Sequence, residues 1–248
     1  YQQFARHAMV GGLESLARKG IDLWSYKDNA FKNLFDSEFR YAYPDGTSPG
    51  INDSGRAAVG SGWTAMAFDY AYLRYGDPKY AVTVNKTLRQ LHHSPACYFP
   101  TRIYETLPEV PVKGQSSLVF DQLGYAICRG EENGSDTFLL MDYGPHGGTH
   151  GHYDKLNLVL FADGDELAGE PQQFVYEDSR HANWTRPSIA HWTLSVDEHS
   201  QNPATGRLIC FADEGDVKVM RAQAIGAYAG VALDRTVVQL PGCLVDVF

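Results

Sequence analysis

The apolar residues in the first third of the chain recur at helical spacing. Phe4, Met9, Leu13 and Leu16 fall on one face of a helix, and Gly20 follows them as a stop signal. The same pattern predicts further helices over 28–34, 57–75 and 78–91. Residues 1 to about 93 therefore predict helices joined by short connections, arranged as antiparallel pairs.

Beyond residue 113 the pattern changes to short apolar runs separated by Gly and Asx turns, with no helices between them. Such runs are typical of an antiparallel sheet or sandwich. The predicted strands cover 117–120, 125–129, 137–141, 156–161, 166–168, 190–196, 207–212, 217–222, 231–238 and 243–248.

A loop-like segment with four prolines, 92–113, separates the two patterns. We therefore expect a helical domain over 1–112 and an antiparallel β domain over 113–248. The chain starts with Tyr rather than Met, and its last residues form a strand-like run. These ends predict an internal piece of a longer protein, with the β domain incomplete at its C-terminus.

The composition is that of a globular protein, with 44% apolar and 21% charged residues. The net charge of -9 argues against nucleic acid as a partner, although a local basic cluster can still bind an anionic substrate. No apolar run reaches the roughly 18 residues that a membrane span needs. The four cysteines lie far apart, so they indicate thiols rather than a disulfide framework or a cysteine zinc site.

The densest chemistry lies between two predicted strands, where three histidines occur within seven residues. His146, His150 and His152 are followed by Asp154 and Lys155, which either pair with each other or face solvent. Histidine titrates near neutral pH and is the commonest metal ligand. The segment therefore predicts a metal site, an acid/base site, or both.

His150 and His152 share one face if their segment is extended. They could chelate one metal together, or one could bind metal while the other faces a substrate cleft. Glu170 and His191 supply further donors downstream. Two histidines and a glutamate suit zinc, with a fourth position open to water.

Other side chains are candidates for contact with an anionic or sugar substrate. Arg129, Arg180 and Arg186 could each fork a carboxylate or sulfate. Trp184 and Trp192 serve either as core residues or as sugar platforms, and the aromatic content of 12% fits both.

The segment 142–157, Asp-Tyr-Gly-Pro-His-Gly-Gly-Thr-His-Gly-His-Tyr-Asp-Lys-Leu-Asn, resembles a known stretch of the heparinase II/III-type polysaccharide lyases. The match is to the His-Gly-His-x-Asp-Lys stretch of their oligoalginate-lyase branch, polysaccharide lyase families 15 and 17. Weaker similarity to the same family covers 1–5, 44–53, 120–129 and 190–197.

This resemblance implies an α+β multidomain fold, in which an incomplete α/α toroid precedes an antiparallel β-sandwich. It implies β-elimination at a 4-linked uronate to give a 4,5-unsaturated uronate, as in an exolytic oligoalginate lyase. Such chemistry needs donors that offset the uronate carboxylate charge. It also needs a base for the C5 proton and an acid for the leaving oxygen, and a tyrosine can serve in both roles.

Residue by residue, Tyr1 matches the family's catalytic tyrosine and His150 the histidine that faces the substrate carboxylate. His152, Glu170 and His191 match the zinc positions, with Glu170 standing where family members often carry Asp. The resemblance implies a structural zinc, although the identity of the divalent metal stays open.

We expect an anionic uronate oligosaccharide or polysaccharide as the partner, no nucleic acid and no membrane, and a homodimer is compatible with the family. A periplasmic or secreted location follows from the resemblance alone. The residues that we assign to substrate binding are Asn52, Arg129, His146, Tyr176 and Arg186.

Three alternatives stay open. A heparin or heparan sulfate exolyase is one, although the 21 Lys and Arg residues are spread rather than clustered as sulfate recognition would require. A zinc-dependent hydrolase would use His150, His152, Glu170 and His191 around a zinc-bound water. A carbohydrate-binding module without catalysis is the third, and the dense titratable cluster argues against it.

Overall fold

The computed structural model describes residues 2–61, 64–83, 115–171 and 173–248, which form two compact units. The first unit contains the described residues of Tyr1–Ala42, Gly46–Ser48 and Ala57–Val112. The second contains those of Tyr43–Asp45, Pro49–Arg56 and Lys113–Phe248. Parts of the long loop 43–56 thus belong to the β unit, although the loop precedes the predicted boundary at residue 112.

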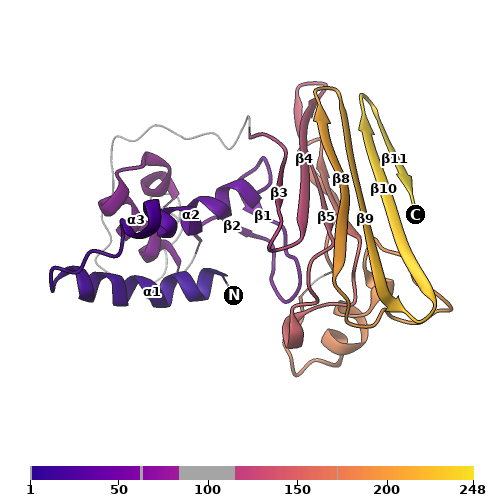
Figure 1. The fold of residues 1–248 in the computed structure, drawn as a ribbon, viewed down its shortest axis with the longest axis horizontal. Coiled ribbons are helices and arrows are strands. Elements are labelled where there is room, and N and C mark those ends of the chain that lie inside the picture. The colour runs from indigo at the N-terminus through magenta and orange to yellow at the C-terminus, as the bar shows by residue number, and fades with distance from the viewer. Residues whose placement is uncertain (1, 62–63, 84–114, 172) are drawn as a thin grey trace. The chain divides into compact units, whose positions relative to one another are not determined.

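The first unit is helical, with α1 at Gln2–Ala17, α2 at Tyr26–Tyr41 and α3 at Ala65–Tyr75 (Figure 1). The start predicted for α3 at residue 57 is wrong, because Ala57–Ala58 forms β2 and pairs with β1 (Thr47–Ser48). Residues 78–83 are helical as predicted, and the rest of 78–91 lies outside the described residues. Within the described ranges, no helix has the length and apolar character that a bilayer span requires.

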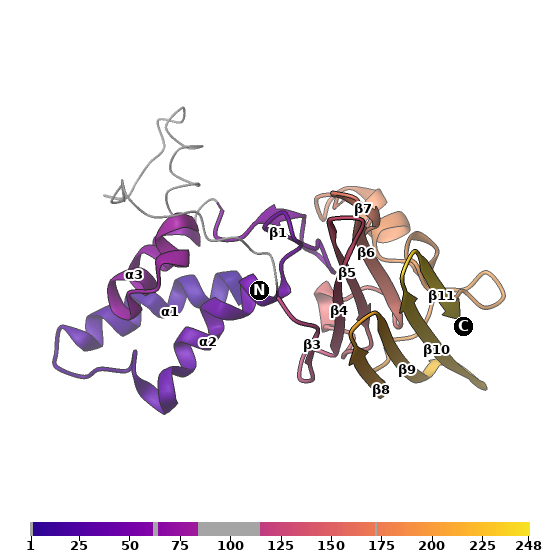
Figure 2. The same ribbon diagram turned by 90° about the horizontal axis from the view of Figure 1, so that it is seen from above.

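The second unit contains two antiparallel sheets packed as a sandwich, which Figures 1 and 2 show as two layers. In each sheet, strands that follow one another in the chain lie side by side. The first sheet comprises β3 (Leu118–Phe120), β4 (Tyr125–Glu132), β5 (Ser135–Asp142), β6 (Asn157–Ala162) and β7 (Asp165–Ala168). The second comprises β8 (Gly206–Glu214), β9 (Val217–Tyr228), β10 (Val231–Leu240) and β11 (Cys243–Val247).

Alternating side chains of the two sheets form the core of the sandwich. Leu139 and Met141 of β5 and Met220 and Ala222 of β9 belong to one buried apolar cluster. This alternation is the period-two pattern that aligned sheet packing requires.

The other face of β5 and β6 is apolar as well, and the segment Tyr43–Asp45 covers part of it. The ring of Tyr43 lies 5.0 Å from those of both Phe138 and Phe161. These contacts explain why a segment far upstream belongs to the β unit.

The strand predicted over 190–196 is absent, and a 3₁₀ turn, η4 (Ser188–Ala190), precedes an irregular segment. The backbone N–H of Trp192 donates to the side-chain oxygen of Asn157 at 2.8 Å, and the hydroxyl of Thr193 donates to the carbonyl of Lys155 at 2.6 Å. The polar groups of this segment find hydrogen-bond partners without pairing with a neighbouring strand. The segment therefore need not form a strand, although its sequence alternates.

Two glycines hold the turn between β3 and β4 against the chain that leaves β5. Gly124 has φ +73°, and a Cβ atom there would stand 2.0 Å from the Cα of Gly144. The Gly144 N–H donates to Asp142 Oδ1 at 2.8 Å, so this approach also fixes the start of the histidine-rich connection.

We expect Gly124→Ala to destabilise the protein more than Gly134→Ala does. Both positions have positive φ, which costs an alanine about 1–2 kcal/mol. The alanine at 134 meets open space, whereas the one at 124 meets backbone and adds about 1–3 kcal/mol of overpacking. Urea unfolding of the two variants measures the difference, and equal losses would contradict the close approach.

Candidate functional site

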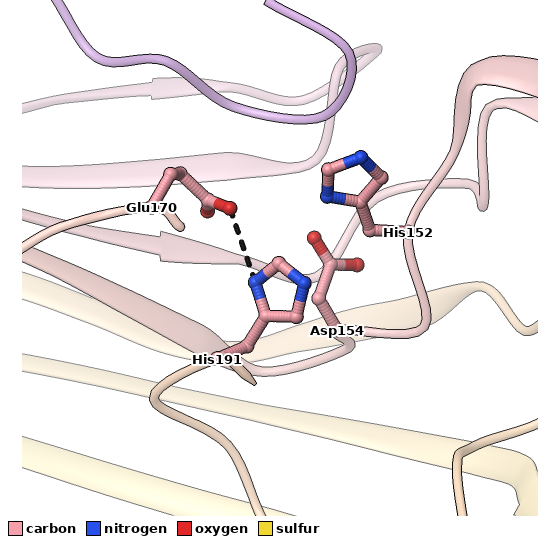
Figure 3. A group of neighbouring side chains, drawn as sticks. All are labelled: His152, Asp154, Glu170 and His191. Carbon is pink, nitrogen blue, oxygen red and sulfur yellow. Dashed lines mark ion pairs between the residues drawn. The ribbon is translucent and has the colours of Figure 1, made fainter. Parts of the chain in front are cut away.

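Four potential metal ligands converge at one end of the first sheet. His152, Asp154, Glu170 and His191 each offer one ligand atom, and these atoms all lie within 4.8 Å of one another (Figure 3). The first two come from the connection between β5 and β6, the third follows β7, and the fourth follows η4. None of the four side chains is more than 3% exposed. Residues far apart in the sequence therefore form one buried donor set.

Several donor atoms in this set make no hydrogen bond to the described residues. They are Nδ1 of His152, Nδ1 of His191, both carboxylate oxygens of Asp154, and Oε2 of Glu170. Buried polar atoms almost always have partners, so a group of facing lone pairs favours a bound cation or proton. The donor set fits a divalent metal with nitrogen and oxygen ligands, such as zinc.

The other ring nitrogens of the two histidines are already held. His191 Nε2 lies 3.0 Å from the carbonyl oxygen of Thr185. Because a carbonyl only accepts, His191 Nε2 must carry the hydrogen and Nδ1 keeps its lone pair. His152 Nε2 lies 3.1 Å from Asp53 Oδ1, which leaves its Nδ1 toward the donor set in the same way. This outer arrangement is typical of histidines that bind metal.

Asn157, at the start of β6, orients the glutamate. Its side-chain amide donates to Glu170 Oε1 at 2.6 Å, which leaves Oε2 to approach His191 Nδ1 at 3.0 Å (Figure 3). This contact is an ion pair when the His191 ring is protonated on both nitrogens. Burial raises the pKa of Glu170 to about 7, against the opposing effect of His191. A proton thus occupies this pair readily, and a metal ion would take its place.

Asp154 keeps its negative charge because a buried lysine lies beside it. Lys155 Nζ is 3.3 Å from Asp154 Oδ1 and 3.2 Å from Asp142 Oδ2, with all three side chains at most 3% exposed. Burial would raise the pKa of Asp154, but the charges of Lys155, His191 and His152 outweigh it and the pKa is lowered. Of the two predictions for Asp154 and Lys155, pairing is correct and exposure to solvent is wrong.

Asp154 is a fourth donor that the predicted ligand set does not contain. A signal was present, because Asp154 follows His152 at the same two-residue spacing that separates His150 from His152. The spacing alone could not distinguish a ligand from a surface carboxylate.

His150 lies in a different environment from His152. The two do not share an extended strand, because His150 ends the 3₁₀ turn η2 (Gly148–His150). Its side chain is 32% exposed, against 1% for His152. Its Nδ1 lies 2.9 Å from Asp53 Oδ2 and 3.2 Å from the hydroxyl of Tyr176. The structure therefore separates a partly open histidine from a buried one.

Asp53 connects three histidines, which we name the Asp53 cluster: Asp53, His150, His152 and His181. Its Oδ1 lies 2.7 Å from His181 Nε2, in addition to the contacts with the other two rings. Burial would raise the pKa of Asp53, but the hydrogen bonds from His181, His152 and His150 outweigh it and the pKa is lowered. Asp53 and His181 are absent from the predicted site, although Asp53 ends the loop 44–53 that carries part of the family resemblance.

Three of the predicted substrate-binding residues lie beside these histidines. Asn52 accepts a hydrogen bond from the His152 N–H at 3.0 Å, and Tyr176 contacts His150 as described. His146 Nδ1 donates to the carbonyl oxygen of His152 at 2.9 Å, and burial lowers its pKa. Asn52 and His146 thus hold the backbone of the histidine segment.

The two predicted arginines have different positions. Arg186 donates to the carbonyl of Gly151 from Nε and Nη2, at 3.2 and 3.1 Å, so it supports the same segment. Arg129 is buried over the ring of Phe138, and burial lowers its pKa to about 10. It pairs with Phe138, four residues along β5 from Asp142, so the structure does not bring it to the site.

The remaining candidates are two tryptophans, one arginine and Tyr1. Trp184 and Trp192 are about half exposed rather than in the core. Arg180 forms an exposed ion pair with Asp178. Tyr1 lies outside the described residues.

Comparison with known proteins places these features in a family. Residues 112–242 match the sequence model of the heparinase II/III-like C-terminal family. An alginate lyase of Stenotrophomonas maltophilia (strain K279a) is 28% identical over 134 residues, and an exo-oligoalginate lyase of Saccharophagus degradans is 27% identical over the same length. Each alignment covers 47% of this chain but only 18% of the relative.

Solved structures are similar over a longer stretch. The heparan sulfate lyase HepC from Pedobacter heparinus has a TM-score of 0.72 at 16% identity, covering 99% of this chain and 37% of the other. A heparinase III structure has a TM-score of 0.66 at 15% identity, covering 98% of this chain and 38% of the other. These likenesses confirm the predicted fold class, and the chain spans well under half the length of either protein.

The family match covers just over half of the chain. It includes β3 to β10, the histidine-rich connection and all four converging donors. The strands, the buried donor set and the similar proteins all agree with this family match. The chain belongs to the heparinase II/III-like family.

Proposed function

We propose that this chain is part of a polysaccharide lyase that cleaves 4-linked uronates by β-elimination. The observation that carries the proposal is the position of His150. Its ring is partly exposed, while its Nδ1 is tied to the buried carboxylate of Asp53. A ring held in this way can present Nε2 to a substrate in a fixed orientation.

In this proposal, His150 contacts the uronate carboxylate and offsets its charge as the C5 proton leaves. Tyr176 is exposed, and its hydroxyl lies beside His150, so it can contact the same sugar. Tyr1 would act as base and acid, by the family resemblance alone. The C5 proton passes to the base, and the electron pair left on C5 forms the C4–C5 double bond. The C4–O4 bond breaks, and the leaving oxygen keeps its electron pair and takes a proton from the acid.

We infer oligoalginate as the substrate and exolytic action as its mode. The two relatives named above are an alginate lyase and an exo-oligoalginate lyase. The histidine segment 142–157 resembles the same branch of the family. Heparan sulfate is the second candidate, supported by the names of the similar structures, which at 15–16% identity show the fold alone. A periplasmic or secreted location stays a prediction.

We also propose that the donor set holds a structural zinc. All four donors are protein side chains, and none of these side chains is more than 3% exposed, as in closed structural sites. A hydrolase needs a position open to water and substrate, so this burial favours the lyase over the zinc-dependent hydrolase. When bound, the metal would fix the two connections at this end of the sheet.

Protein containing this chain should produce 4,5-unsaturated uronate from alginate oligosaccharides. Ultraviolet absorbance and mass spectrometry of the products follow the reaction on polymannuronate, polyguluronate, heparan sulfate and chondroitin. We expect His150→Ala to lower kcat by about 100-fold or more, the range for loss of one positioned catalytic group.

His199→Ala is the matched control, because His199 is exposed and its ring contacts the carbonyl of the nearby Asp197. If the protein cleaves heparan sulfate alone, heparan sulfate replaces alginate as the proposed substrate. Absence of unsaturated product from every polymer, with folded protein, would overturn the lyase proposal.

The purified protein should contain close to one equivalent of zinc by elemental analysis. Glu170→Gln and His191→Ala should each lower this content, because each removes a buried donor. Chelation should lower the melting temperature, and activity should decline only as the protein unfolds.

Glu177→Gln is the control for the glutamate change, because Glu177 is exposed in the loop after β7. Zinc content that is unchanged in Glu170→Gln would contradict the donor set. Immediate loss of activity on chelation, with the melting temperature unchanged, would favour the hydrolase.

A further inference from the structure

The carboxylate of Asp53 is buried, and it is approached by three imidazole rings. Its side chain is only 2% exposed. Oδ1 faces Nε2 of both His152 and His181, at 3.1 and 2.7 Å, while Oδ2 faces Nδ1 of His150 at 2.9 Å. A carboxylate accepts hydrogen bonds at both oxygens, so all three ring nitrogens can donate to it at once.

The backbone around Asp53 holds the carboxylate in this place. The Asp53 N–H donates to the carbonyl of His150 at 3.4 Å, and Asn52 accepts from the His152 N–H. Asn52 has φ +57°, a conformation that asparagine tolerates better than most residues. The loop is therefore held to the backbone of the histidine segment by the main chain of Asp53 and the side chain of Asn52, independently of the ring contacts.

We infer that Asp53 is a positioning residue that fixes which nitrogen carries the hydrogen in His150 and in His152. The inference rests on the proposed function for its catalytic consequence, and on geometry alone for the tautomers. A hydrogen on His152 Nε2 leaves its Nδ1 lone pair facing the other three donors. A hydrogen on His150 Nδ1 leaves Nε2 as the atom that meets the substrate.

One carboxylate thus serves two histidines with opposite requirements. His152 must direct the lone pair of Nδ1 toward the buried donor set, whereas His150, whose side chain is 32% exposed, must direct that of Nε2 toward the substrate. His181 contacts the same Oδ1 as His152, and its ring meets the edge of Tyr176 at 5.0 Å. Asp53 therefore also connects Tyr176, through His181, to the same cluster.

Replacing Asp53 with asparagine should change the tautomer of His150 and leave that of His152 as it is. Asp53→Asn supplies one oxygen and one NH₂ group. His152, whose Nδ1 faces the metal ligands, retains its Nε2 hydrogen, so the amide oxygen stays on that side. The NH₂ group then faces His150 Nδ1, which must accept, and the hydrogen of that ring moves to Nε2.

Two-bond ¹H–¹⁵N correlation spectra distinguish these tautomers directly. They are recorded on the zinc-replete protein at a pH where the rings are neutral. We expect the Nδ1–H form of His150 in the unmodified protein and in Asp53→Glu, and the Nε2–H form in Asp53→Asn. The zinc content of Asp53→Asn should stay near that of the unmodified protein, because His152 keeps its tautomer.

Kinetics on the substrate that the lyase assay identifies give the second readout. We expect Asp53→Asn to lower kcat by about 100-fold or more and to change KM by less than about threefold, since the wrong tautomer at a similar position in a serine protease costs about 10⁴-fold. Asp53→Glu should recover part of the loss. Asp178→Asn, an Asp-to-Asn change at an exposed ion pair in the neighbouring loop, should alter neither readout.

An unchanged His150 tautomer in folded Asp53→Asn would overturn the inference. So would a kcat loss that Asp53→Glu does not relieve, since a carboxylate would then have no special role. If the unmodified protein acts on no uronate polymer, the proposed function fails, while the spectra still decide the role of Asp53.

Discussion

The buried charge at one end of the sandwich is the constraint on which the site depends. Lys155 lies between Asp142, where β5 ends, and Asp154, which belongs to the donor set. Such a group is stable only when its partners are all present, because loss of one leaves an unpaired charge in a medium of low polarity. The end of β5 and the donor set are therefore held by one electrostatic unit.

The main chain of Lys155 extends this unit to the second connection. Its N–H donates to Gln201 Oε1 at 2.7 Å, and its carbonyl accepts from the hydroxyl of Thr193 and the amide of Gln201. The segment that carries His191 is thereby fixed to the segment that carries His152. Charge pairing and backbone hydrogen bonding together bring the donors into one place, although the two histidines are 39 positions apart in the sequence.

Much of the fold could be predicted from the local pattern of apolar and polar residues. The site could be predicted from the sequence only in part. The strands from β3 to β7 and from β8 to β11 were predictable because alternation is a local property of the chain. The segment 190–196 shows the same alternation, yet its polar groups bond to Asn157 and Lys155, which only the folded chain brings near. Local pattern cannot reveal a partner of that kind.

The site shows the same division. His152, Glu170 and His191 could be named from residue type and from the family resemblance, and the structure brings all three together. Asp53 and His181 could not be recognised, because a single carboxylate in a polar loop resembles any connector. Their importance comes from contacts across 97 to 128 residues of sequence.

The place of Asp53 in the chain affects how the site can form and how it can be divided. The loop Pro49–Arg56 lies between helical segments of the first unit in sequence, yet it completes the second unit. Closing a contact over about 100 residues carries a large entropy cost and has a high contact order, so the cluster should assemble late in folding. The family match begins at residue 112, and a fragment cut there would retain the donor set but lack the carboxylate that orients His150. The candidate site therefore includes residues that lie outside the family match.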